Sequence, residues 1–205
     1  MNSPAIQPQP ETLAPRTVTV SEELEASGPV TIPWWKYEFA DFGCSQGGSL
    51  AHCLKRFDAR SGIGIDIDPD KVEKTRAAGF DAALADLHQL DGTKSVRFVS
   101  MMQFLEHLPS LTEVERVIGK AASLATDFLY IHHPSFEDEH YLESNGLRLY
   151  YHHWTGHITH VLRNEFFEMF ERLGLLQYHV RPLLPIASRD HEAVLPLSAP
   201  VNQHQ

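Results

Sequence analysis

One stretch constrains the fold of this chain more than any other: EFADFGCSQGGSLAHCLKRF, from Glu38 to Phe57. A segment that reads as a strand runs past Asp41 into a turn with three glycines, and the residues after the turn read as a helix. Such a turn lets a ligand come close to the backbone, beside the free N–H groups of the helix. The stretch therefore predicts an α/β fold with a ligand site at this turn.

Strand and helix signals alternate along the rest of the chain. Strands are expected at 37–43, 61–67, 80–86, 96–102, 127–133, 175–184 and 191–197. Helices are expected at 47–57, 69–79, 110–125 and 163–174. This order predicts a doubly wound α/β fold, with a mostly parallel seven-stranded sheet and helices on both faces.

Length and composition favour one soluble domain. The chain has 205 residues, of which 42% are apolar and 21% charged, which fits a single domain over residues 31–205. Residues 1–30 are rich in Pro, Gln, Ser and Thr and lack periodicity, so we expect them to be disordered.

Charge, hydropathy and cysteine content exclude several classes of partner. A formal net charge of −10 argues against nucleic acid, which needs a basic protein face. No segment has the apolar length of a membrane span, and the N-terminus lacks a signal-peptide pattern. The two cysteines make neither a disulfide framework nor a four-cysteine metal site. We therefore expect a cytoplasmic protein; its oligomeric state cannot be derived from the sequence.

Charge also separates the ligands that bind at such a turn. A nucleoside triphosphate needs a Lys followed by Ser or Thr after the glycines, whereas Gly48 and Ser49 follow Gly47 here. A dinucleotide would place its pyrophosphate near Asp41, and like charges at a few ångström in a partly desolvated site repel by several kcal/mol. A cationic ligand without phosphate gains from the acid instead.

At this point the chain resembles the class I S-adenosylmethionine-dependent methyltransferases, in the type 11/23 branch. Their first motif, an acid, one residue and then G-x-G-x-G, stands here as Asp41-Phe42-Gly43-Cys44-Ser45-Gln46-Gly47, with Ser45 in place of the middle glycine. The resemblance implies that S-adenosylmethionine is the cofactor. It also implies that the residues around it at this turn are Asp41, Gly43, Cys44, Ser45 and Gly47.

The later motifs of that family also find matches in order. By resemblance, Asp66 in GIGIDIDPDKV binds the ribose hydroxyls and Ile67 packs on the adenine, while Asp68 caps the next helix. Asp86 in LADLHQL reaches the adenine amino group, with the backbone N–H of Leu87 near the ring; a plain turn is the alternative for Asp86. Gln103, just before the run F-L-E-H-L, lies where the methionine part binds.

A histidine-rich stretch, 131–162, allows three interpretations: a substrate wall, a polar aromatic surface or a metal site. The resemblance favours the substrate wall. The expected catalytic histidines are then His157 and His133, one of which takes a proton from a hydroxyl or stabilises an anionic oxygen. The expected substrate contacts are His107, His132, His152, His153 and Trp154. No residue is assigned as a metal ligand, because no strict metal signature occurs.

The sequence thus predicts a methyltransferase that acts on a small-molecule acceptor. The short chain favours a small acceptor, such as a sugar or a natural-product hydroxyl. Transfer to oxygen is expected, with nitrogen and carbon as the alternatives. Two alternatives remain open from the residues alone: a non-catalytic S-adenosylmethionine-binding or scaffold protein, and a metal-dependent enzyme that uses the cluster from His132 to His160.

Overall fold

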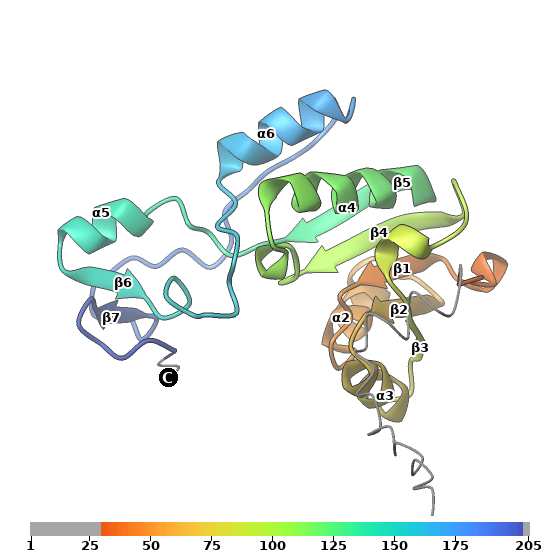
Figure 1. The fold of residues 1–205 in the computed structure, drawn as a ribbon, viewed down its shortest axis with the longest axis horizontal. Helices are drawn as coiled ribbons and strands as arrows, with labels where there is room; N and C mark the ends of the chain where they lie inside the picture. The colour runs from red at the N-terminus through yellow and green to blue at the C-terminus, as the bar shows by residue number, and fades with distance from the viewer. Residues whose placement is uncertain (1–29, 203–205) are drawn as a thin grey trace, which may run out of the picture.

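The computed structural model describes residues 30–202. At its centre is a five-stranded sheet in the order β3-β2-β1-β4-β5, in which all pairs are parallel (Figure 1). The strands are β1 (Phe39–Phe42), β2 (Gly62–Asp66), β3 (Asp81–Leu84), β4 (Val96–Met102) and β5 (Ala125–His132). The longer helices are α2 (Gly48–Arg56), α3 (Pro69–Ala77), α4 (Leu111–Leu124) and α6 (Arg163–Arg172). Single 3-10 turns are η1 (Trp34–Lys36), η2 (Leu87–Gln89) and η3 (Leu105–His107).

Helices cover the two faces of the sheet because side chains alternate along each strand. Phe39 and Phe98 point toward α2 and pack with Leu50 and Cys53 in one apolar cluster. The opposite face of the sheet packs against α4 and α6 in a larger cluster (Figure 1). The predicted doubly wound layers are therefore confirmed.

The helix boundaries follow from local chemistry. The Asp68 carboxylate accepts hydrogen bonds from the backbone N–H groups of Asp70 and Lys71, and Pro69 occupies the first turn of α3. The Ser110 hydroxyl accepts a hydrogen bond from the Glu113 N–H at the start of α4. Gly174 follows α6 with a φ of 69°, in the left-handed region that glycine favours.

The expectation of a seven-stranded sheet is wrong for the described residues. The segment 175–184 forms no strand; Tyr178 instead stacks on Phe167 and contacts Phe170 of α6. Pro182 removes a backbone donor that a strand would need. Leu176, Val180, Leu183 and Leu184 are exposed, and β5 is an edge strand of the sheet.

The strand expected at 191–197 exists, but it is not part of the central sheet. β7 (Val194–Pro196) pairs antiparallel with β6 (Leu147–Leu149) in a separate two-stranded sheet next to α5 (Glu139–Ser144). This small unit stands beside the carboxyl ends of β4 and β5 (Figure 1). Its buried centre holds Arg148, whose guanidinium donates to the carbonyl oxygens of Tyr150 (3.3 Å) and Pro200 (2.8 Å).

Two further expectations concern the N-terminal segment and membrane-spanning helices. The disordered segment expected at 1–30 lies, but for its last residue, outside the described residues. Across residues 30–202, no helix combines the length and the apolarity that a membrane crossing requires.

We expect the Phe98→Ala substitution to destabilise the fold strongly. Phe98 is fully buried and stacks between Phe39, at a ring distance of 4.7 Å, and Phe128, at 4.8 Å. Loss of such a ring costs about 3–5 kcal/mol in the free energy of unfolding, measured by urea denaturation. The matched control is Phe128→Ala on the edge strand, where 37% of the residue is already exposed. Equal losses in both variants would contradict this account of the core.

Candidate cofactor and acceptor site

Asp41 links the glycine turn to the sheet through hydrogen bonds. Its buried carboxylate accepts hydrogen bonds from the hydroxyl of Ser100, at 2.6 Å on β4, and from the hydroxyl of Ser49 in α2. Burial raises the pKa of Asp41 to about 6, against the lowering effect of both hydroxyls, and the charge of Asp66 raises it further. Because Asp41 is 0% exposed, we expect it to act on a bound cofactor through its charge and not by direct contact.

The turn needs its glycines for reasons visible in the structure. Gly43 and Gly47 have φ values of 72° and 86°. A methyl group on Gly43 would come within 2.2 Å of the ring of Phe104, and one on Gly47 within 2.7 Å of the ring of Phe80. Ser45 also has a positive φ, 50°, which is uncommon for a residue with a side chain. The backbone here is held in one conformation by packing.

The side chain of Cys44 points away from the site. It is 1% exposed, belongs to the cluster under α2, and its sulfur lies 3.6 Å from the Thr75 hydroxyl. Burial raises the pKa of the thiol to about 11, so it stays protonated at neutral pH. Only the backbone of Cys44 can face a cofactor.

Asp66 ends β2 beside the turn, where the motif predicts the ribose acid. One carboxylate oxygen accepts from the N–H of Ser45 and the other from the N–H of Asp68, both at 3.1 Å. A carboxylate offers about four lone-pair sites, so two remain for ribose hydroxyls. Ile67 is 52% exposed next to it and offers an apolar surface for a flat ring. These two residues fit a nucleoside, and Asp68 is the helix cap expected from the sequence.

The remaining expected cofactor residues lie at the ends of β3 and β4. The Asp86 side chain accepts a hydrogen bond from the N–H of His88 and so caps η2, which is the turn role considered from the sequence. Leu87 packs partly against the large core cluster. Gln103 is exposed, has a φ of 50°, and its N–H donates to the carbonyl of His132.

A buried carboxylate surrounded by histidines lies just after β4. Glu106 is fully buried, and the ring of His133 comes within 3.3 Å of one of its oxygens, while the ring of His157 comes within 3.9 Å of the other. Neither approach has the geometry of a hydrogen bond, so both oxygens lack a donor among the described residues. His107 completes the group, with its ring centre 5.2 Å from that of His157. We call these four residues the Glu106 cluster.

The structure separates the other expected acceptor residues. Trp154 packs its ring edge-on against His107 and His157 and so belongs to the wall of the Glu106 cluster. His153 pairs with Glu143 at 2.8 Å, outside the cluster. His152 is buried beside Phe136. Burial lowers the pKa of the His152 imidazole to about 4, so the ring is neutral.

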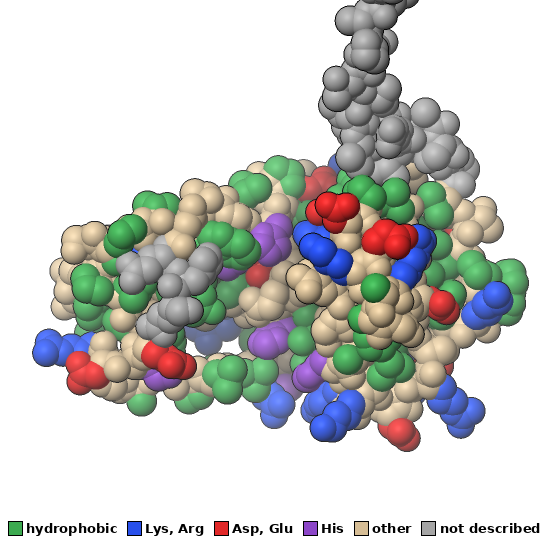
Figure 2. All heavy atoms as spheres, turned by 90° about the horizontal axis from the view of Figure 1, so that it is seen from below, with side chains coloured by type: hydrophobic (Ala, Val, Ile, Leu, Met, Phe, Trp, Pro, Cys, Tyr) green, Lys and Arg blue, Asp and Glu red, His purple; other side chains and the backbone are tan. Residues whose placement is uncertain are grey.

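The two adjacent histidines at the end of β5 differ in the way that strand alternation predicts. His133 faces Glu106 and the ring of Phe166. His132 is half-buried, which lowers its pKa. Figure 2 shows histidine side chains gathered in the hollow between the sheet and the small β6–β7 unit.

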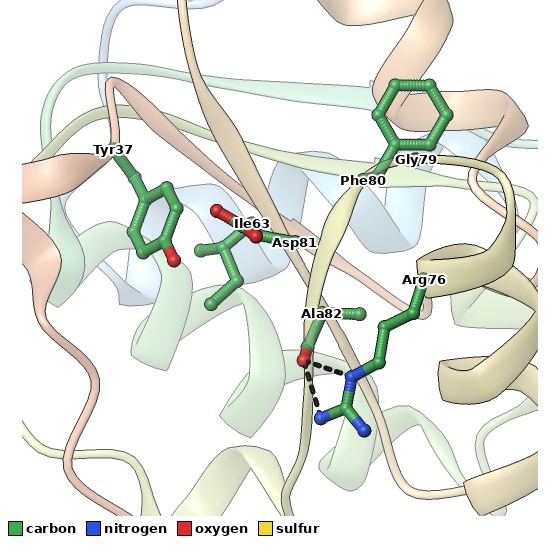
Figure 3. A pocket seen from close by; sticks show the side chains of 7 residues that line it. All are labelled: Tyr37, Ile63, Arg76, Gly79, Phe80, Asp81 and Ala82. Atoms are coloured by element: carbon green, nitrogen blue, oxygen red, sulfur yellow. Dashed lines mark hydrogen bonds between the residues drawn. The ribbon is translucent and has the colours of Figure 1, made fainter.

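A separate hollow on the described surface lies away from this site. It measures about 410 Å³ and is lined by Tyr37, Arg76, Asp81 and their neighbours, at the amino ends of β1 and β3 (Figure 3). Ligands of parallel sheets bind beyond the opposite, carboxyl ends. The guanidinium of Arg76 already donates to the carbonyl of Ala82. The topology therefore favours the glycine turn over this hollow as the expected ligand site.

Comparison with known families identifies the family of this chain. The family model described as "Methyltransferase domain" matches residues 11–179. The chain belongs to this methyltransferase family. The resemblance to class I S-adenosylmethionine-dependent methyltransferases is confirmed, and with it the expectations of an enzyme and of S-adenosylmethionine as its cofactor.

Solved structures show the same fold. An S-adenosylmethionine-dependent methyltransferase from Archaeoglobus fulgidus has a TM-score of 0.54 at 23% identity, over 76% of this chain and 67% of that one. A Haloferax volcanii protein bound to the Trm112 methyltransferase activator has a TM-score of 0.54 at 20% identity, over 76% and 67%. Magnesium protoporphyrin IX methyltransferase from Synechocystis, with bound S-adenosylhomocysteine, has 0.50 at 20%, over 76% and 68%. No curated protein matches in sequence.

Sequence reasoning missed two residues of this site. Phe104 packs over Gly43, and Glu106 is the centre of the histidine cluster. The signal was present in the run F-L-E-H-L, where an acid adjoins His107. Its burial could not be inferred, because charged residues after a strand are usually solvated.

We expect Asp41→Asn to weaken the dependence of stability on pH. The folded-state pKa of about 6 lies above the ordinary value of 3.8, so protonated Asp41 favours the folded state below about pH 4, and that stability is lost as the pH rises through 6. A shift of this size corresponds to about 3 kcal/mol. Urea denaturation between pH 4 and 7 measures it. Exposed Asp70→Asn is the control, and parallel curves for wild type and Asp41→Asn would contradict the assignment.

Proposed function

We propose that the protein transfers a methyl group from S-adenosylmethionine to an oxygen nucleophile of a small-molecule acceptor, such as a sugar or natural-product hydroxyl. The observation that supports this most directly is the Glu106 cluster. It places imidazole groups and a carboxylate in a dry wall beyond the carboxyl ends of β4 and β5, next to the expected cofactor residues. We also propose a cytoplasmic location for the enzyme.

The cofactor site is proposed to follow the order of the strands. Asp66 would hold the ribose hydroxyls, Ile67 and Leu87 the adenine ring, and Asp86 the adenine amino group. The backbone of residues 43–47 and the side chain of Gln103 would contact the methionine part. The negative charge of Asp41 under the turn favours a cationic ligand at short range.

Bound S-adenosylmethionine supplies a methyl group on a positively charged sulfur, which is a good leaving group. The protein then has to align the acceptor oxygen with that carbon at roughly 3 Å and keep water out. His133 or His157 would take the hydroxyl proton as the new carbon–oxygen bond forms, and the sulfur would keep the electron pair of the broken bond. Burial lowers the pKa of His157, which favours the neutral ring that can accept a proton.

The remaining histidines would shape the acceptor pocket. His107 and Trp154 contact His157 directly and are proposed to contact the acceptor beside it. His132, His152 and His153 lie on neighbouring segments and are proposed to line the rest of the acceptor pocket. Aromatic rings of this kind can stack on a flat or sugar-like acceptor while their nitrogens bind its hydroxyls.

We expect Asp66→Ala to weaken the binding of S-adenosylhomocysteine by about 10- to 100-fold, because two hydrogen bonds to a charged acceptor are lost. Isothermal titration calorimetry measures this at neutral pH. Asp68→Ala is the matched control: it removes a helix cap two residues away and should lower stability but leave the affinity within about threefold. No binding by the wild-type protein would overturn the proposed function, and full affinity in Asp66→Ala would move the ribose role to another residue.

We expect His157→Ala to lower kcat about 100-fold or more with a hydroxyl acceptor, since a positioned base contributes about this much. The affinity for S-adenosylhomocysteine should stay unchanged. Turnover is measured as S-adenosylhomocysteine release over a panel of sugar, phenol and amine acceptors. The control is His140→Ala, an exposed histidine of α5. Unchanged turnover in His157→Ala would remove this histidine from the reaction, and binding without transfer to any acceptor would favour a scaffold role.

A further inference from the structure

The carboxylate of Glu106 presents an electrostatic problem that the methyl-transfer scheme does not solve. The residue is 0% exposed, and neither oxygen receives a hydrogen bond from the described residues. A buried charge without partners costs several kcal/mol, so proteins pair such charges or use them to bind metals. The side chains around Glu106 therefore decide whether its charge is paired or binds a metal ion.

The hydrogen bonds of two neighbouring histidines orient their rings. The Nδ1 atom of His107 lies 2.7 Å from the carbonyl oxygen of Gly156, and Nδ1 of His157 lies 3.0 Å from that of Tyr151. A carbonyl oxygen only accepts, so both Nδ1 atoms carry the proton. In the neutral rings, both Nε2 atoms then present a lone pair. Metal-binding histidines show this arrangement, in which the second ring nitrogen donates to a carbonyl.

Nε2 of His157 lies 3.9 Å from one oxygen of the unpartnered carboxylate. One possible ligand atom from each of Glu106, His107 and His157 lies within 4.8 Å of the other two. Without a cation, three acceptors would face each other in a dry site. We propose that a divalent transition-metal ion of the zinc type binds between Glu106, His107 and His157.

The donor set supports this class of ion. Two imidazoles and one carboxylate form a ligand set of catalytic zinc sites, which keep a fourth position open. Imidazole suits zinc, iron and cobalt, whereas magnesium and calcium prefer all-oxygen sites. Ligand atoms at about 2.1 Å from a tetrahedral ion lie roughly 3.4 Å apart, so the three side chains would contract by about an ångström.

A second group of possible ligands offers a contrast within the same chain. Glu139, Glu143 and His153 are also close together. There, however, His153 already bonds Glu143 at 2.8 Å, and Glu139 already bonds His160 at 2.7 Å. Between these two groups, the cluster at Glu106 is the one whose carboxylate lacks donors.

The ion would refine the proposed function, on which this step rests. An acceptor hydroxyl at the open position would lose its proton more easily, because a bound cation lowers its pKa. His133 stands beside Glu106 at 3.3 Å, and neither of its ring nitrogens has a hydrogen-bond partner among the described residues. His133 would then accept the proton, and His157 would position the hydroxyl through the ion. The expected acceptor is an alcohol or phenol.

The test is metal binding itself, measured without turnover. The full-length protein is stripped with chelator, and Zn²⁺ is titrated by calorimetry; Co²⁺ is added to a second sample to record its visible absorption. We expect one equivalent of each ion and intense tetrahedral Co²⁺ bands. Glu106→Gln, His107→Ala and His157→Ala should each weaken binding at least tenfold, and circular dichroism checks that they fold. His153→Ala should keep the wild-type affinity.

Two results would overturn the proposal. The first is the absence of Zn²⁺ and Co²⁺ binding by the wild-type protein. The second is binding that survives in Glu106→Gln and His157→Ala but is lost in His153→Ala, which would place the ion at the other group. Neither result bears on the binding of S-adenosylhomocysteine, which is measured separately. The metal proposal can therefore fail while the proposed methyl transfer stands, and the two failures are distinguishable.

Discussion

The architecture depends on one buried carboxylate that joins three elements. Asp41 lies opposite Ser100 in the register of β1 and β4, and Ser49 reaches it from the first turn of α2. The sheet, the turn and the helix are thereby fixed relative to one another at the point where the chain crosses over. Because the strands are parallel, their carboxyl ends meet at this edge, and residues from distant parts of the sequence converge there. The residues proposed to bind the cofactor and the acceptor come from these converging segments.

The sequence predicts the central fold well because local signals agree with the tertiary packing there. Each of the five sheet strands and four main helices was expected, since periodicity, helix caps and burial all point the same way. The sixth strand fails for a physical reason. An alternating pattern such as 175–184 reports only that one side is apolar, not what covers it, and Tyr178 finds its partners on α6.

The candidate site, too, could be predicted from the sequence only in part. Asp66 and Ile67 lie where their motif implies, because motif position follows strand position, and strand ends are predictable. Glu106 was overlooked because its burial arises from the segment 157–159, whose backbone N–H groups at Ile158 and Thr159 bond the carbonyl of Glu106 itself. Such a contact between residues about fifty positions apart leaves no local trace in the sequence.

Arg148 has a consequence for anyone who engineers this chain. A guanidinium cannot shed its proton inside a protein, so it needs permanent acceptors when it is enclosed. The carbonyls of Ala199 and Pro200 supply two of them from close to the C-terminal end. Removal of the chain from Ala199 onward would leave the buried guanidinium of Arg148 without these acceptors, in the small sheet beside the Glu106 cluster. An affinity tag is therefore better joined beyond these residues than substituted for them.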